Sequence, residues 1–207
     1  MNEFFDYLDS LFPDAVCELN YKKDYEFLIS VMLSAQTTDK RVNMVTSELF
    51  SKYDTLEKLS NASLEAVKDI IKPIGTYNRK AIYVIEIAKE LLNKYNGVLP
   101  NTHKELETLP GVGHKTANVV LGTIYGVPSF AVDTHVSRVS KRLGFASPKD
   151  DVNIIEKKMK KLVPKERWVK THHQMVLFGR YHCRSQNPDC ANCFLYKKCK
   201  YFNKKKI

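Results

Sequence analysis

The feature that most restricts the fold of this chain is a cluster of four cysteines near its C-terminal end. Cys183, Cys190, Cys193 and Cys199 follow one another with six, two and five residues between them. Four thiolates so close in sequence can surround one metal centre without ligands from elsewhere, so this segment has to wrap around a common point. The spacing fits a four-thiolate zinc site or an iron–sulfur cluster, and two disulfides are a weaker third interpretation. Cysteines that only fill a core would not need to be clustered.

Composition narrows the class of protein. The chain has 207 residues, of which 43% are hydrophobic, so it can form one large domain or two small ones with a real core. Its net charge of +10 favours a polyanionic partner, nucleic acid before an anionic membrane, although a solvated lysine-rich surface would give the same charge. We see no secretory leader and no membrane-spanning stretch, which favours a reducing compartment where thiols persist.

Apolar residues recur at helical spacing along nearly the whole chain, and no segment alternates convincingly like a β-strand. The clearest apolar stripes cover residues 25–33, 81–92 and 117–124, and Asn96-Gly97 is a typical end for the second of these helices. The chain is therefore predicted to be all-α, with a mobile basic end at Lys204–Lys206. Further helices are expected at 39–50, 63–70, 102–108, 134–143, 151–162 and 168–180.

A glycine-rich turn stands between two of the predicted helices, in the segment Leu109-Pro-Gly-Val-Gly-His-Lys-Thr-Ala117. Glycine permits a positive φ and puts no Cβ between the backbone and a ligand. The N–H groups of such a turn and of the next helix N-terminus can bind a phosphate oxygen without reading a base. An ordinary interhelical turn is the alternative interpretation.

Two charged residues near such turns could carry chemistry. Lys115 falls in the first turn of a helix, where a cation is disfavoured, and partial burial would further favour the neutral, nucleophilic amine. A lysine that contacts phosphate or solvent is the alternative. Asp133 lies where an N-cap is expected, and the carboxylate could also steer proton transfer and stabilise positive charge.

Taken in order, these motifs resemble endonuclease III, the bifunctional DNA glycosylase of the helix-hairpin-helix superfamily. The glycine-rich turn with Lys115, then Val-Asp-Thr-His-Val around Asp133, then the cysteine spacing all match, and the similarity begins at Leu33-Ser-Ala-Gln-Thr-Thr-Asp39. Each motif alone is moderately specific, and the ordered set is very specific.

The resemblance implies an all-α, two-lobed fold. One lobe is a six-helix bundle formed by residues 17–128, with the helix-hairpin-helix at about 102–125. The other lobe combines residues 1–16 with 129–207. It carries the catalytic aspartate and holds a [4Fe–4S] cluster in the loop 183–199, with Cys183, Cys190, Cys193 and Cys199 as ligands.

The resemblance also implies roles for individual residues. Lys115 would be the Schiff-base nucleophile, and Asp133 would assist its deprotonation and the opening of the sugar. The turn residues Gly111, Val112 and Gly113 would offer backbone N–H groups to a DNA phosphate.

Further positions match the family with less defined roles. Gln36 would fill the gap left by a flipped nucleotide, Asp39 would lie near the lesion pocket, and His135 would lie near the DNA backbone. Thr76 and Arg184 are also expected to contact DNA, but these two positions depart from the family. Thr76 replaces a common wedging leucine, and Arg184 is the only basic residue between the first two cysteines, where relatives often carry several.

The function implied is base excision repair by a glycosylase with AP lyase activity. It would remove oxidised or ring-saturated pyrimidines from duplex DNA and cut the strand 3′ to the abasic site by β-elimination. Its partner would be double-stranded DNA with damaged bases or abasic sites. We expect a monomer without membrane association, cytoplasmic and bound to the nucleoid through DNA in a prokaryote.

Three alternatives remain open. A mismatch-specific adenine or thymine glycosylase often lacks the lysine, and the adenine-removing relatives carry an extra C-terminal domain. A non-enzymatic, metal-bearing DNA-binding module would not need Lys115 and Asp133. A pure electron-transfer protein would need a cluster but not the charge of +10.

Overall fold

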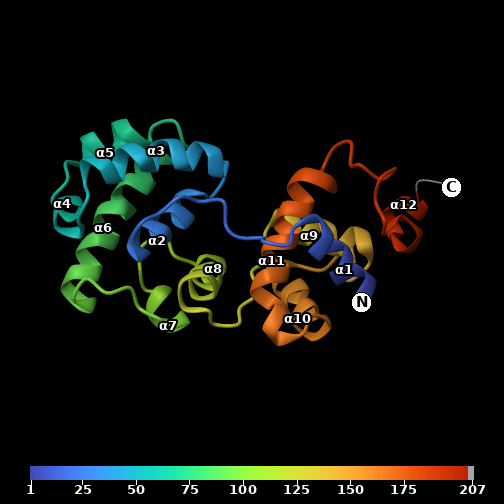
Figure 1. The fold of residues 1–207 in the computed structure, drawn as a ribbon. Coiled ribbons are helices and arrows are strands. Elements are labelled where there is room, and N and C mark those ends of the chain that lie inside the picture. The colour runs from blue at the N-terminus through green and yellow to red at the C-terminus, as the bar shows by residue number, and fades with distance from the viewer. Residues whose placement is uncertain (205–207) are drawn as a thin grey trace. The chain divides into compact units, whose positions relative to one another are not determined.

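The computed structural model describes residues 1–204, which form helices joined by turns and loops (Figure 1). No strand occurs among these residues, so the all-α prediction is confirmed. The predicted mobile end at Lys204–Lys206 lies outside the described residues from position 205 onward. Within the described part, no helix has both the length and the apolar character needed to span a membrane.

The chain forms two compact units. One is continuous and contains Glu18–Tyr125, and the other combines Met1–Cys17 with Gly126–Ile207. We refer to them as the continuous unit and the two-ended unit. Lys115 belongs to the continuous unit, whereas Asp133 and the four clustered cysteines belong to the two-ended unit.

The continuous unit contains the helices α2 to α8. Their bounds are α2 Asp24–Leu33, α3 Asp39–Lys52, α4 Leu56–Ser60, α5 Leu64–Ile71, α6 Tyr77–Tyr95, α7 His103–Leu106 and α8 His114–Tyr125. Threonines cap three of them, because the hydroxyls of Thr38, Thr55 and Thr102 accept from a backbone N–H three residues later. The end predicted at Asn96-Gly97 is confirmed, since both residues adopt positive φ after α6.

Helix α2 is the centre of this unit and packs against α3, α6 and α8. The sequence predicted a single buried stripe, but nine of its ten residues are buried, including Glu26. The Glu26 carboxylate accepts the N–H groups of Lys22 and Lys23 at 2.7 and 3.2 Å, which compensates its burial. A helix buried on all sides can hold its neighbours in fixed positions.

The two-ended unit contains α1 and α9 to α12. Their bounds are α1 Asn2–Leu11, α9 Thr134–Leu143, α10 Val152–Leu162, α11 Trp168–Leu177 and α12 Lys200–Lys204. The helix predicted at 134–143 is confirmed. The single helix predicted at 168–180 is wrong at its end, because a π-helix begins at Phe178. There, Arg138 donates to the Gly179 carbonyl at 2.7 Å, and a Cβ on Gly179 would lie 2.8 Å from the His135 Cβ.

Residues from both ends of the chain form the core of the two-ended unit. Phe4, Phe5 and Leu8 of α1 pack in one cluster with residues of α9, α10 and α11. The Asp9 carboxylate also accepts hydrogen bonds from Arg167 and Gln174, both at 2.8 Å. Burial acts to raise the pKa of Asp9, but these bonds and Lys170 hold it well below its usual value. Helix α1 is thus fixed by residues more than 150 positions away.

Candidate active site and cysteine centre

The glycine-rich turn links α7 to α8, and its two glycines differ in backbone conformation and in the space around them. Gly111 adopts φ +74°, and a Cβ there would lie 2.5 Å from Cδ2 of Tyr83, so only glycine fits. Gly113 has no positive φ, and a Cβ at this position would meet no atom within 4 Å. The backbone at Gly113 is therefore open to an approaching ligand.

The turn leaves backbone donors available. Val112 buries its side chain and donates its N–H to the Leu109 carbonyl at 3.1 Å. Among residues 1–204, the N–H groups of Gly111, Gly113 and Lys115 have no acceptor. Such donors at the start of a twelve-residue helix form a site for an anion.

Lys115 lies in the first turn of α8 and is exposed. The partial burial considered from the sequence is therefore not found. No hydrogen bond or ion pair to its ammonium occurs within the described part of the chain. Its amine is accessible to a substrate that approaches the turn.

A surface hollow in the same unit brings together three of the predicted DNA-contacting residues. Gln36, Thr76 and Gly111 line it, together with Arg79 and Tyr83. Gln36 and Thr76 are exposed and adopt φ of 60° and 58°, a region that costs a non-glycine residue roughly 1–2 kcal/mol. Strain of this kind is concentrated at functional sites and has to be held by surrounding contacts.

One such contact comes from Lys80, which the sequence analysis missed. Lys80 is 4% exposed and donates to the carbonyls of Leu33 and Ala35 at 2.9 and 2.6 Å. Burial lowers the pKa of its ammonium. The signal was present in the sequence, because Lys80 falls four residues before Val84 on the apolar stripe of α6. By contrast, Asp39 is the half-buried first residue of α3 and does not line this hollow.

Asp133 is the N-cap of α9, as predicted. Its Oδ1 accepts the Val136 N–H at 2.7 Å, and Oδ2 makes no hydrogen bond within residues 1–204. The carboxylate is half-buried. Capping therefore uses one oxygen and leaves the second for another partner.

Helix α9 also carries a histidine and two arginines on its inner face. Nδ1 of His135 lies 3.1 Å from Nη2 of Arg138, and burial lowers the pKa of this imidazole. Arg142 donates to the carbonyls of Arg184 and Ser185 at 2.6 and 2.9 Å. Arg138 and Arg142 each donate to the Cys183 carbonyl at 3.2 Å. The helix capped by Asp133 is thus tied directly to the start of the cysteine loop.

The four clustered cysteines line one hollow in the two-ended unit. None of them is in a disulfide. Apolar and aromatic side chains complete the walls, among them Leu143, Phe178, Tyr196, Tyr201 and Phe202. Burial and then the charges of the other three cysteines raise the pKa of the Cys193 thiol, so four thiolates here need a cation to offset their charge. Nη1 of Arg142 lies 3.4 Å from the Cys183 sulfur and supplies one positive charge.

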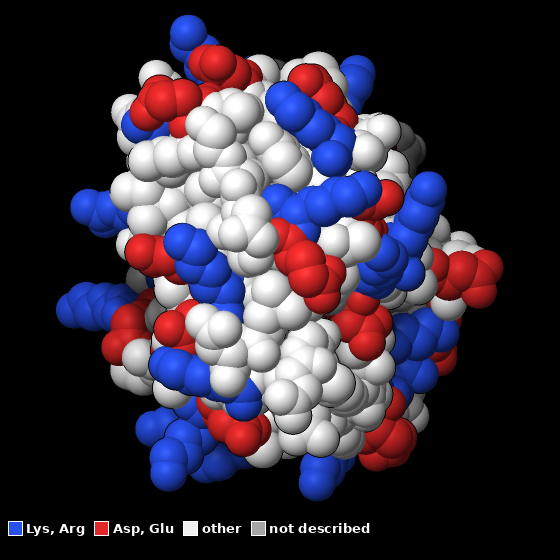
Figure 2. Space-filling model, turned by 90° about the vertical axis from the view of Figure 1, so that its left-hand side faces the viewer, with Lys and Arg blue, Asp and Glu red and all other residues white. Residues whose placement is uncertain are grey.

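Arg184, predicted to contact DNA, is exposed but donates to the Asn187 carbonyl at 3.0 Å within its own loop. The charged residues of the chain are unequally divided between the two units. The two-ended unit has 19 of the 33 lysines and arginines and 10 of the 23 acidic residues, whereas the continuous unit has 14 and 13. Figure 2 agrees, because basic and acidic side chains are mixed over the face it shows, which carries α4 and α6 of the continuous unit.

Known proteins resemble this chain along nearly all of its length. Residues 29–165 match the family of HhH-GPD superfamily base excision DNA repair proteins. The chain is 47% identical to endonuclease III of Bacillus subtilis (strain 168), over 94% of this chain and 89% of that protein. It is 44% identical to endonuclease III of Escherichia coli (strain K12), over 93% and 90%.

Solved structures of DNA glycosylases are also similar to this chain over nearly all of its length. A trapped endonuclease III–DNA covalent intermediate, described as an estranged-adenine complex, superposes with a TM-score of 0.95 at 47% identity, over 100% of this chain and 97% of that one. A thermostable thymine-DNA glycosylase has a TM-score of 0.86 at 24% identity, over 98% and 96%, and shows a shared fold only.

The family match and the similarity to solved endonuclease III structures show that the chain is a glycosylase of the helix-hairpin-helix class. Within that class the chain belongs to the endonuclease III family. It is an enzyme of base excision repair, a DNA glycosylase with AP lyase activity. Membership of this family also suggests a metal cofactor.

Proposed function

We propose that this enzyme removes oxidised or ring-saturated pyrimidines from duplex DNA, with Lys115 as its nucleophile. The observation that carries the proposal is the exposed ammonium of Lys115, which has no partner among residues 1–204 and follows a turn with open N–H donors. Gly111 and Gly113 would bind a phosphate of the damaged strand and so bring its sugar to Lys115. The covalent endonuclease III–DNA intermediate supports a nucleophile of this kind, at 47% identity.

The reaction follows from these groups. The neutral amine of Lys115 attacks C1′ of a flipped nucleotide, the glycosidic bond breaks, and its electrons leave with the base. The C1′–O4′ bond then breaks, O4′ takes a proton, and the nitrogen lone pair forms the C=N bond of a Schiff base in the opened sugar. The Schiff base makes the C2′ proton acidic, and its removal expels the 3′ phosphate by β-elimination. Oδ2 of Asp133, which has no hydrogen bond within the described residues, would accept the lysine proton and stabilise positive charge at the sugar, while Oδ1 stays on the helix cap.

Gln36 and Thr76 would contact the DNA after the damaged nucleotide has flipped out of the duplex. Both are exposed at the rim of one hollow, where an amide or hydroxyl could contact the base left without a partner. Thr76 is smaller than the leucine common at its position, so we propose that Gln36 carries most of this role. His135 and the exposed Arg184 would contact the DNA backbone, and Asp39 would lie near the lesion.

The four cysteines fit a [4Fe–4S] cluster, since four thiols that form no disulfide line one hollow with apolar walls beside an arginine. When bound, the cluster would supply a rigid anchor for the loop 183–199. Lysine attack and β-elimination are redox-neutral and need no electron from it. Iron and acid-labile sulfide at about four each per chain would support this assignment, and a colourless, zinc-loaded, fully active protein would contradict it.

Borohydride trapping on a duplex with an abasic site tests the proposal. The wild type should form a covalent adduct, and Lys115→Ala and Lys115→Gln should form none while they retain duplex affinity. Because Lys115 is exposed, neither substitution should affect folding. An adduct that persists in both variants would show that another amine is the nucleophile. In a prokaryote such an enzyme would work in the cytoplasm on nucleoid DNA.

The mismatch-glycosylase alternative shares this fold, so the fold does not discriminate. Lys115 discriminates, because a glycosylase that activates water needs no amine at this position. A non-enzymatic DNA-binding module is excluded by membership of the family.

A further inference from the structure

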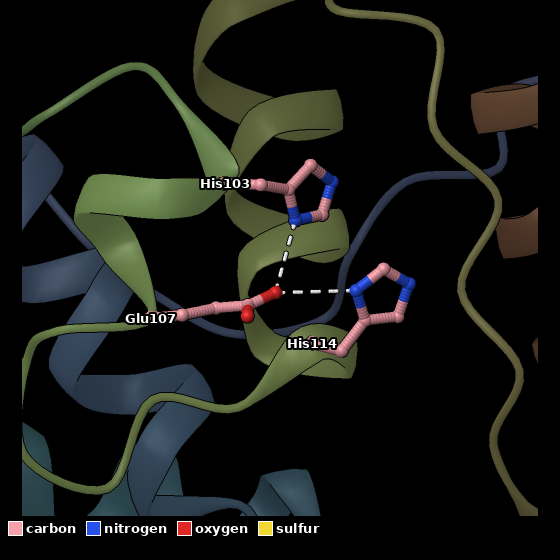
Figure 3. A group of neighbouring side chains, drawn as sticks. All are labelled: His103, Glu107 and His114. Atoms are coloured by element: carbon pink, nitrogen blue, oxygen red, sulfur yellow. Dashed lines mark hydrogen bonds and ion pairs between the residues drawn. The ribbon is translucent and has the colours of Figure 1, made fainter.

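Three side chains of the hairpin converge beside Lys115 (Figure 3). His103 lies on α7, Glu107 follows that helix, and His114 is the first residue of α8. Oε1 of Glu107 lies 3.4 Å from Nδ1 of His103 and 3.2 Å from Nδ1 of His114. The two imidazole rings stack with centroids 4.9 Å apart and an interplanar angle of 20°. Two imidazole nitrogens thus face the same carboxylate oxygen, which brings three possible ligand atoms together.

These separations suit a metal ion. Zinc binds imidazole nitrogen and carboxylate oxygen at about 2.0–2.1 Å in tetrahedral geometry, which puts neighbouring ligand atoms about 3.3 Å apart. The two measured separations, 3.4 and 3.2 Å, agree with that edge length. All three ligand atoms lie within 4.8 Å of one another, so small side-chain rotations close the third edge.

We propose that His103, Glu107 and His114 bind one divalent transition-metal ion of the zinc type. Imidazole ligands favour zinc over calcium and magnesium, which prefer sites made of oxygen alone. Three protein ligands leave a fourth position for water or an anion. The three side chains are 38%, 40% and 54% exposed, so the ion can enter from solution. The donor set is distinct from the four thiols, which lie in the other unit.

The ion would have two effects on the hairpin. It would join the end of α7 to the start of α8 across the glycine turn. It would also change the net charge of the cluster from the single negative charge of Glu107 to a positive one. One of its ligands, His114, is adjacent in sequence to both Gly113 and Lys115. If the turn binds phosphate, as the proposed function has it, the ion would strengthen that binding, and its open position could take a phosphate oxygen.

Calorimetry with Zn²⁺ on the purified enzyme, its cysteine centre intact, tests the site directly. The wild type should bind one ion, and His103→Ala and Glu107→Gln should each weaken binding by about tenfold or more. Glu86→Gln, which removes another exposed glutamate of the continuous unit, should bind zinc like the wild type. X-ray absorption at the zinc edge should show nitrogen and oxygen ligands. Equal zinc affinity in all four proteins, or sulfur ligands, would overturn the proposal.

Duplex affinity tests the effect on DNA. Saturating Zn²⁺ should tighten binding of undamaged duplex about threefold or more at low salt in the wild type and in Glu86→Gln, and leave His103→Ala unchanged. An unchanged affinity in the zinc-loaded wild type would overturn the phosphate-binding effect. Borohydride trapping reports separately on Lys115, so a failure of the proposed function is distinguishable from a failure of the metal site.

Discussion

Asp133 combines two demands in one carboxylate. Its Oδ1 holds the first turn of α9 through the Val136 N–H, and its Oδ2 has no hydrogen bond within the described residues. Structure and chemistry can be separated at this position, because asparagine is an equally good N-cap but carries no charge. The same separation is not possible at Lys115, because the ammonium proposed as nucleophile makes no hydrogen bond or ion pair within the described residues that a substitute could preserve.

Asp133→Asn should leave folding intact and reduce turnover by orders of magnitude, since the charge that assists lysine and sugar is lost. The measurements are the melting temperature and the single-turnover rate on a duplex with one damaged pyrimidine. Asp151→Asn is the matched control, because Asp151 caps α10 through an equivalent bond to Ile154 at 2.9 Å and should keep full activity. If Asp133→Asn turned over like Asp151→Asn, Asp133 would be a helix cap and nothing more.

At the scale of elements, two sets of long-range hydrogen bonds, which we call anchors, each hold a loop segment against a helix. Helix α9 carries Asp133 at one end and grips the cysteine loop with Arg138 and Arg142 along its length. Helix α6 holds the turn after α2 through the buried ammonium of Lys80. Each anchor connects a rigid helix to a segment with little regular structure of its own.

Arg142→Met should loosen the cysteine loop, because the carbonyls of Cys183, Arg184 and Ser185 lose charged hydrogen bonds of about 1.5–3 kcal/mol each before solvent screening. We expect faster amide exchange across residues 183–199 and faster loss of metal to a chelator. Lys141→Met, at the neighbouring and equally half-buried position, should behave like the wild type. Equal rates of metal loss in the two variants would show that Arg142 does not hold the loop.

Lys80→Met should destabilise the continuous unit by about 1–3 kcal/mol, because the Leu33 and Ala35 carbonyls lose their donor. The strained turn at Gln36 should then relax, so damaged-base removal should slow more than trapping at a preformed abasic site. Lys89→Met, on the exposed face of the same helix, should change neither rate nor stability. If the ratio of the rate of damaged-base removal to the rate of abasic-site trapping were the same in Lys80→Met as in the wild type, the hydrogen bonds of Lys80 would not support binding of the flipped-out nucleotide.

How far the sequence predicts such features depends on the range of the interactions. Helices with a strong apolar period, such as 134–143, were predicted from local residues. Helix α4 was missed because five residues are too short to show a period. The role of Lys80 depends on carbonyls 45 and 47 residues earlier, and that of Arg142 on a loop about 40 residues later. The motifs predicted Lys115, Asp133 and the cysteines, but no local pattern indicates what Lys80 or Arg142 contacts.

At the scale of the whole molecule, positive charge is concentrated in the unit that carries Asp133 and the cysteines. That unit has nearly twice as many basic as acidic residues, while the continuous unit is almost balanced. In the proposed function, the continuous unit would therefore depend on backbone N–H groups to bind phosphate, and the two-ended unit would supply most of the long-range attraction.

Affinity for undamaged duplex should consequently fall steeply with salt, with a linear slope of log K against log salt of about −0.9 for each phosphate neutralised. Affinity should hardly vary with sequence, since neither the hairpin nor diffuse charge reads bases. Fluorescence anisotropy on several duplexes between low and physiological salt measures both. A strong sequence preference on undamaged DNA would contradict a hairpin that contacts only phosphate.

The discontinuity of the two-ended unit has a consequence for synthesis on the ribosome. Helix α1 emerges before the continuous unit, but the residues of the later chain that bury Phe4, Phe5 and Leu8 and that pair with Asp9 lie between positions 130 and 195. The continuous unit has all its residues by Tyr125 and can fold while translation proceeds. The apolar face of α1 therefore stays exposed until residues 130 to 195 have emerged, and during that time the nascent chain presents to chaperones an apolar surface that is buried in the folded enzyme.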